Sequence, residues 1–145
     1  MQALLLNPDT FLLMSAMLCL LIGSAFFSAS ETAFFFLSTE EIKAFQQNDR
    51  PSERIVVGLL KEPDRLLTAI LFWNLLINLS FFACGVVISS KLLANGNNAA
   101  AGLFGILNLS LMIVFGEVGP KSSAVMFRQP LARLVSFPLA FAVKL

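Results

Sequence analysis

The chain has 145 residues, of which 57% are hydrophobic and 13% are charged, and its formal net charge is +1. Soluble domains carry about 25% charged residues, so this composition is typical of a membrane protein. A net charge this small gives no indication of nucleic-acid binding, and we expect none. The sequence contains no histidine, which excludes imidazole catalysis and the commonest transition-metal ligand.

Three uncharged runs are long enough to cross a bilayer, which takes roughly 20 residues of helix. They cover residues 10–30, 66–90 and 99–116, which are 21, 25 and 18 residues. We therefore predict an all-α integral membrane protein with three transmembrane helices, at about residues 10–37, 66–90 and 99–117, in the lipid bilayer of the cell (plasma) membrane.

Charged residues are concentrated between the first two spans, in residues 38–65. Ser38 and Glu41 have the spacing of a capping box, which indicates a helix start. Intermittent apolar positions after them predict a charged amphipathic segment at the membrane interface. Pro63 and Asp64 are typical of the opening of the second span.

After the third span, the last uncharged run is residues 134–143, which is only 10 residues and contains Pro138. This run is too short to cross a bilayer. We predict a juxtamembrane helix over about residues 121–145.

The basic residues predict the orientation, because cytoplasmic loops are enriched in Lys and Arg. The loop after the first span and the segment after the third are basic, whereas the opposite side holds only Lys91. We therefore expect the N-terminus outside and the C-terminus in the cytoplasm. The basic residues on the cytoplasmic side are Lys43, Arg50, Arg54, Lys61, Arg65, Lys121, Arg128, Arg133 and Lys144.

Each span has polar residues towards its expected cytoplasmic end. Ser24 and Ser28 share one face of the first helix with Glu31, and Asn74 and Asn78 share one face of the second. The third span ends on Gly116 and Glu117, with Pro120 shortly after. Pro120 has no N–H to donate to the carbonyl four residues earlier, that of Gly116, so we expect the third helix to be interrupted at residues 116–120.

These residues have similar expected depths and offer hydroxyl, amide, backbone and carboxylate oxygens. Oxygen ligands suit Mg²⁺ or Ca²⁺ better than zinc or copper. Each residue also has a structural interpretation. The serines and asparagines could pack or bond between helices, Glu117 could pair with Lys121, and Glu31 could be a helix-end charge.

Two motifs sharpen this interpretation. Ser24-Ala-Phe-Phe-Ser28-Ala-Ser30-Glu31-Thr32-Ala33 and Phe115-Gly116-Glu117-Val118-Gly119-Pro120-Lys121 resemble the transmembrane domain of the CorC/cyclin M (CNNM) family of magnesium transporters, also called domain of unknown function 21. The resemblance covers essentially the whole chain.

The resemblance implies a homodimer that exports Mg²⁺, coupled to Na⁺ influx, through an inward-opening site in each subunit. Its metal ligands would be Ser24, Ser28, Asn74, the Gly116 carbonyl and Glu117, with Asn78 as the alternative to Asn74. The family's cytoplasmic CBS and C-terminal domains are expected to be absent from this chain.

Two other functions compete with transport. A membrane-embedded sensor or anchor would bind Mg²⁺ without moving it. An intramembrane hydrolase would use Glu31, Glu117, Lys121 and a serine, but the sequence has no histidine and no G-x-S-x-G nucleophile motif. We therefore expect no enzyme.

Overall fold

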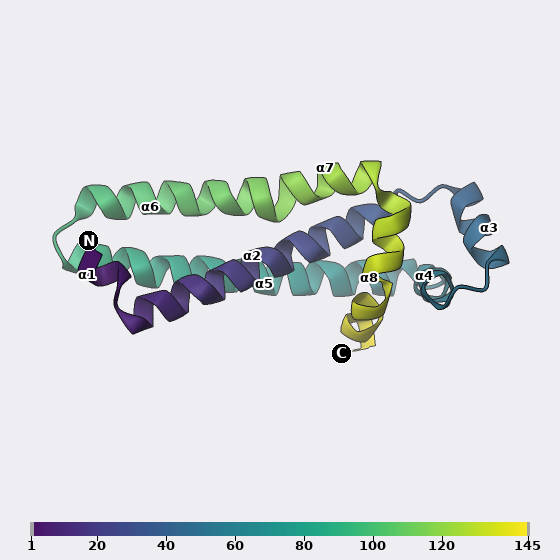
Figure 1. The fold of residues 1–145 in the computed structure, drawn as a ribbon, viewed down its shortest axis with the longest axis horizontal. Helices are drawn as coiled ribbons and strands as arrows, with labels where there is room; N and C mark the ends of the chain where they lie inside the picture. Colours follow the sequence, from purple (N-terminus) through teal and green to yellow (C-terminus); the bar gives the residue numbers. More distant parts are fainter. Residues whose placement is uncertain (1, 145) are drawn as a thin grey trace.

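A computed structural model describes residues 2–144 (Figure 1). Met1 and Leu145, the last residue of the expected juxtamembrane helix, lie outside the described residues. The described residues are almost entirely helical, with no strand, as the sequence predicts. Its elements in order are α1 (Gln2–Leu5), α2 (Pro8–Phe35), α3 (Thr39–Gln47), α4 (Pro51–Leu60), α5 (Pro63–Ala94), α6 (Asn98–Leu111), η1 (Met112–Val118), α7 (Gly119–Met126) and α8 (Arg128–Lys144).

Three stretches are long and apolar enough to span a membrane, which confirms the predicted fold class. They are α2, α5 and the continuous run from Asn98 to Met126. Pro8 and Pro63 stand at the first positions of α2 and α5, where a missing N–H costs little. Gly96, with φ of 74°, makes the tight connection between α5 and α6.

The third long helix differs from the expected one because it does not stop at residues 116–120. Its middle part, η1, is a π-helix, in which the Gly119 N–H bonds to the Val114 carbonyl five residues earlier. Pro120 then lies at the start of α7, where its missing N–H is tolerated. The α-helical hydrogen bonding is therefore interrupted as expected, while the helix itself runs on to Met126.

Helix α2 is the central element of the bundle. It packs against α5, η1, α7 and α8, and crosses the other long helices obliquely (Figure 1). Two buried apolar clusters lie along it. One contains Phe34, Phe45 and Leu139, and the other contains Phe81 and Met112. On α2, Ser24 of the predicted site lies between Leu21, which packs against the second cluster, and Phe27, which belongs to the first.

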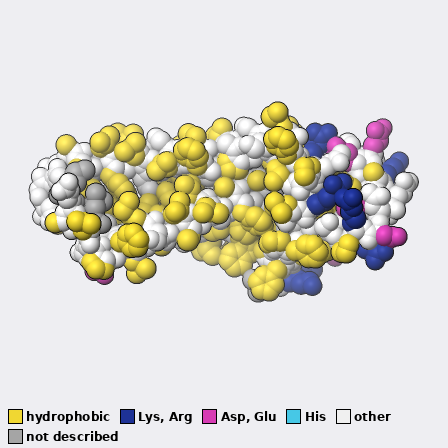
Figure 2. Space-filling model, in the orientation of Figure 1, with side chains coloured by type: hydrophobic (Ala, Val, Ile, Leu, Met, Phe, Trp, Pro, Cys, Tyr) yellow, Lys and Arg dark blue, Asp and Glu magenta, His cyan; other side chains and the backbone are white. Residues whose placement is uncertain are grey.

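Side chains are distributed unequally along the bundle (Figure 2). Hydrophobic side chains cover most of its length, whereas charged side chains gather at the end that holds α3 and α4. Many large apolar residues of the three long helices are exposed, among them Leu18, Leu79 and Ile106. A surface of this kind needs an apolar environment, which agrees with a membrane-spanning protein.

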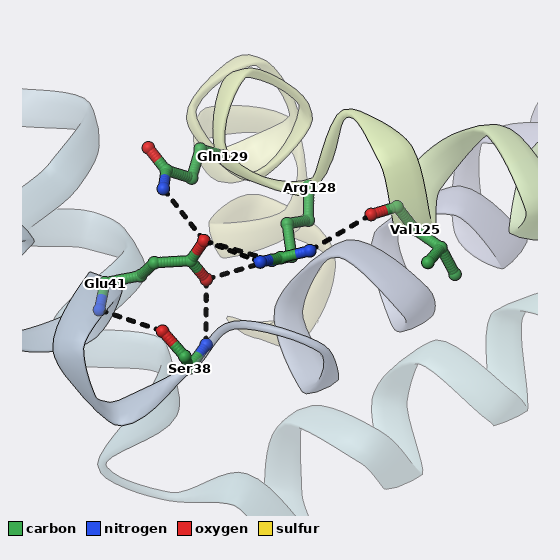
Figure 3. Close-up of polar contacts among 5 residues, drawn as sticks. All are labelled: Ser38, Glu41, Val125, Arg128 and Gln129. Carbon is green, nitrogen blue, oxygen red and sulfur yellow. Dashed lines mark hydrogen bonds and ion pairs between the residues drawn. The ribbon is translucent and has the colours of Figure 1, made fainter.

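At the charged end, the predicted capping box is present. The Glu41 N–H bonds to the Ser38 hydroxyl at 3.2 Å, and the Glu41 carboxylate accepts from the Ser38 N–H at 2.8 Å. The same carboxylate accepts from Arg128 Nε at 3.0 Å and from Gln129 Nε2 at 2.9 Å (Figure 3). These bonds, with Arg128 the largest cause, lower the pKa of Glu41 from its ordinary 4.5 to about 2. Glu41 therefore ties α8 to the start of α3.

A second ion pair holds α8 against α4. Arg133 Nε lies 2.9 Å from an oxygen of Glu53, a fully buried carboxylate, although the N–H does not point at that oxygen. The Arg133 guanidinium also lies over the Phe45 ring, 5.1 Å from its centre. Farther along α8, the Ala142 carbonyl accepts from the Trp73 indole at 3.1 Å. Helix α8 is thus fixed across the charged end of the bundle.

Candidate ion-binding site

Three helices bring their polar residues together at Ser24, which is fully buried on α2. Its hydroxyl oxygen lies 2.8 Å from Asn78 Oδ1, 3.2 Å from Asn74 Oδ1 and 3.4 Å from the Gly116 carbonyl oxygen. A serine hydroxyl has one hydrogen to donate. Three acceptor oxygens therefore surround the one hydroxyl hydrogen of Ser24.

Glu117 adjoins this group through Asn78. The Asn78 amide donates from Nδ2 to Glu117 Oε1 at 3.0 Å, while its carbonyl oxygen faces Ser24. Asn78 thus orients both the hydroxyl and the carboxylate. Glu117 supplies the negative charge among residues that otherwise offer neutral oxygens.

Ser28 lies one turn from Ser24 on the same face of α2. Its hydroxyl is fully buried and has no hydrogen-bond partner in the described part of the chain. Ser30, on the same helix, instead donates to the Phe26 carbonyl at 2.6 Å, the usual arrangement for a serine inside a membrane helix. A buried hydroxyl without a hydrogen bond destabilises the fold, so a ligand that bound the Ser28 oxygen would remove this cost.

Gly116 allows η1 to approach α2 closely. A Cβ at this position would come within 2.6 Å of Met112 Sδ and 3.2 Å of the Ser24 hydroxyl. Pro120 has no N–H to donate to the Gly116 carbonyl, whose oxygen lies 3.4 Å from the Ser24 hydroxyl. The π-helical segment thus contributes a backbone carbonyl to the polar cluster. Such π-helical turns are frequent at functional sites.

Lys121 does not form the ion pair with Glu117 that one structural interpretation of the motif predicts. Its ammonium lies 3.4 Å from Glu31 on α2, and the side chains are 43% and 25% exposed. Glu31 is therefore not simply a solvated helix-end charge. This ion pair joins α2 to α7 on the side of the cluster towards the charged end.

The cluster has the chemistry of a hard-cation site. It holds two hydroxyls, two amide oxygens, a backbone carbonyl and a carboxylate. A divalent cation would bind the acceptor oxygens around Ser24 and the unpaired Ser28 hydroxyl. The oxygens present are therefore of the kind that a hard divalent cation such as Mg²⁺ binds.

Prediction from the sequence found most of this cluster. The structure brings Ser24, Asn74 and Gly116 together and joins Glu117 to them through Asn78, and Ser28 lies one turn farther along α2. It adds Asn78, which had been considered only as an alternative to Asn74, although its i+4 spacing on the same face was a signal for both. The partnership of Glu31 with Lys121 was missed, because no local pattern connects residues 90 positions apart.

The Cyclin M transmembrane N-terminal domain matches residues 14–145, which is nearly the whole chain. The chain belongs to this family. It is 33% identical over 117 residues to the UPF0053 inner membrane protein YfjD of Escherichia coli, and 31% identical over 138 residues to a UPF0053 protein of Haemophilus influenzae. These matches cover 81% and 95% of the chain.

Membership of the Cyclin M family agrees with the fold. With a relative described as an inner membrane protein and three apolar helices of spanning length, the chain is a multi-pass membrane protein. It spans 27% and 32% of the length of the two bacterial relatives.

Proposed function

We propose that this chain is the membrane domain of a magnesium transporter, which binds Mg²⁺ between α2, α5 and η1 and exports it. The convergence of three oxygen acceptors on the single hydroxyl of Ser24 carries this proposal. Family membership adds support, because cyclin M proteins are the magnesium transporters that the two motifs resemble.

The ligands would be Ser24, Ser28, Asn74, the Gly116 carbonyl and Glu117. Mg²⁺ takes about six oxygens, usually including some water. One carboxylate offsets only half of the ion's charge, which favours reversible binding over storage. Asn78 would hold Glu117 and Ser24 in place for the ion.

The polar residues continue from the site towards the charged end of the molecule, through Ser28, Glu31 and Lys121. By the distribution of basic residues, that end lies in the cytoplasm. The site would therefore load from the cytoplasmic side and release outward, in exchange for Na⁺. We propose that the chain works as a homodimer, as the family resemblance implies.

A flux assay tests the proposal. The 145-residue chain is reconstituted in vesicles that enclose a Mg²⁺-sensitive dye, with and without an opposing Na⁺ gradient. We expect Mg²⁺ flux that depends on the Na⁺ gradient and that Glu117→Gln abolishes. Flux equal to that of protein-free vesicles would contradict transport.

One observation favours a second function, that of a magnesium sensor. Helix α8 follows the third span directly and is tied to α3 and α4 by Glu41 and Glu53, so movement of α7 would be passed to whatever follows α8. A sensor would bind Mg²⁺ through the same residues without flux. Binding by calorimetry together with no flux in vesicles would favour this alternative.

Cysteine labelling tests the orientation. A cysteine at Asn97, between α5 and α6, should react with an impermeant reagent from outside the cell. A cysteine at Gln47, at the end of α3, should react only after the membrane is opened. The reverse pattern would contradict a site that loads from the cytoplasm.

A further inference from the structure

Glu31 and Lys121 form an ion pair beside the candidate site, and neither is among its proposed ligands. Glu31 follows Ser28 by about one turn of α2, and Lys121 lies on α7, four residues after Glu117. The ammonium nitrogen of Lys121 is 3.4 Å from Glu31 Oε2. The pair therefore joins α2, which supplies the serines of the site, to α7, which directly follows the η1 segment that supplies the carboxylate.

Lys121 has Glu31 as its partner in the structure, and Glu117, four residues before it, is the partner that sequence spacing suggests. Residues four apart on a helix are neighbours, with Cβ atoms about 5–6 Å apart, so Glu117 is the local partner that the spacing favours. The structure instead places the ammonium on Glu31, and Glu117 accepts from the neutral amide of Asn78 at 3.0 Å. The choice of partner decides whether Glu117 keeps its negative charge available.

The charge at the site follows from this choice. With Lys121 on Glu31, these two charges cancel each other and Glu117 remains a free anion. With Lys121 on Glu117, the only carboxylate among the proposed ligands would be neutralised, and an ammonium would stand where a divalent cation binds. Repulsion between like charges at such distances is strong when they are removed from bulk water.

We propose that Glu31 is a positioning residue for the ion site, which holds the Lys121 ammonium on α2 and so keeps the Glu117 carboxylate free for a divalent cation. This inference rests on the proposed function, since it assigns Glu31 and Lys121 a part in magnesium binding. It predicts that removing Glu31 weakens Mg²⁺ binding because the Lys121 ammonium is released from α2.

The test titrates MgCl₂ into the purified 145-residue chain by calorimetry. Glu31→Gln should weaken Mg²⁺ binding by about tenfold or more, because it frees the ammonium to reach Glu117. Lys121→Met should leave the affinity equal or higher. The double variant should recover most of the affinity that Glu31→Gln loses. Glu62→Gln, which breaks the exposed pair with Arg65 at 3.4 Å, is the matched control and should change nothing.

Several outcomes would overturn the inference. Unchanged affinity in Glu31→Gln would do so, as would a double variant as weak as Glu31→Gln. The latter would mean that Glu31 acts on the ion itself or only on the fold. A structural role would also lower the thermal unfolding midpoint of both single variants, with no recovery of binding in the double variant.

Should Glu31→Gln fail to fold, the double variant is compared with Lys121→Met. The inference predicts equal affinity, because Glu31 has no ammonium left to hold, and a weaker double variant overturns it. A wild-type chain that binds no Mg²⁺ would contradict the proposed function and this inference together. A wild-type chain that binds Mg²⁺ while the double variant shows no recovery would contradict this inference alone.

Discussion

Two carboxylates, Glu41 at the charged end and Glu117 inside the bundle, lie in opposite environments. Glu41 accepts from a backbone N–H, a guanidinium and an amide, so its charge is fully used by the protein (Figure 3). Glu117 accepts one bond, from Asn78, whose carbonyl oxygen is one of three that face the single hydroxyl of Ser24. The first arrangement is complete by itself and fastens α8 to α3. The second lacks positive charge, which is what a bound cation would supply.

The largest effect should come from removing the charge of Glu117 while keeping the shape of its side chain. Glu117→Gln keeps an oxygen acceptor but removes the charge, and neutral dipoles alone replace the hydration of a divalent ion poorly. We expect Mg²⁺ affinity to fall on the order of 100-fold, about 2.7 kcal/mol, with flux abolished. Glu41→Gln is the matched control, and calorimetry should give it wild-type affinity. Equal losses of affinity in both variants would remove the distinction between the two carboxylates.

The serines of α2 should show a smaller effect of the same kind. Ser28→Ala and Ser24→Ala each remove one oxygen and little volume, so we expect Mg²⁺ to bind roughly tenfold more weakly while the fold is retained. Ser30→Ala is the control on the same helix, because the Ser30 hydroxyl is already bonded to the Phe26 carbonyl. Calorimetry that finds all three variants alike would return Ser24 and Ser28 to a packing role.

Pro120→Ala tests the backbone contribution. Restoring an N–H at residue 120 lets it bond to the Gly116 carbonyl, which would convert part of η1 into an α-helix. We expect a higher thermal unfolding midpoint and a loss of Mg²⁺ affinity of a few fold, although Glu117 is unchanged. A stabilised variant with undiminished affinity would show that the Gly116 carbonyl is not a ligand.

The smallest effect should be the acid dependence of stability at the charged end. The pKa of Glu41 is lower in the fold, about 2, than its ordinary 4.5, so the ionised form is the one that stabilises the folded state. Its contribution is fully present above pH 4.5 and is lost as the pH falls towards 2. Thermal unfolding between pH 6 and 3 should therefore show a decline in the midpoint that is smaller in Glu41→Gln. An equal decline in both proteins would mean that Glu41 does not stabilise the fold in this way.

Local patterns in the sequence were sufficient to predict the fold and part of the site. The three spans follow from long uncharged runs, and the start of α3 follows from the spacing of Ser38 and Glu41. Ser24, Asn74 and Glu117 could be grouped because three antiparallel spans place residues of similar depth together. These predictions needed no knowledge of which side chain touches which.

Non-local contacts and backbone adjustments could not be predicted in this way. Pro120 indicated a break, but only the structure shows that a π-helix absorbs it and that the helix continues to Met126. Helical spacing favoured Glu117 as the partner of Lys121, whereas packing of α7 on α2 brings Glu31 to it. Likewise, the bond from Arg128 to Glu41 joins segments far apart in the sequence.

A divalent cation is proposed to bind where oxygens from α5 and η1 converge on the Ser24 hydroxyl of α2. The most direct measurement is an experimental density map of the chain in MgCl₂, with Mn²⁺ substituted in a second crystal to give an anomalous signal. A cation bound at the candidate site should give one ion peak between Ser28, Asn74 and Glu117, within about 2.0–2.6 Å of the ligand oxygens. A map with well-ordered side chains and no ion peak at this position, at millimolar MgCl₂, would contradict this prediction.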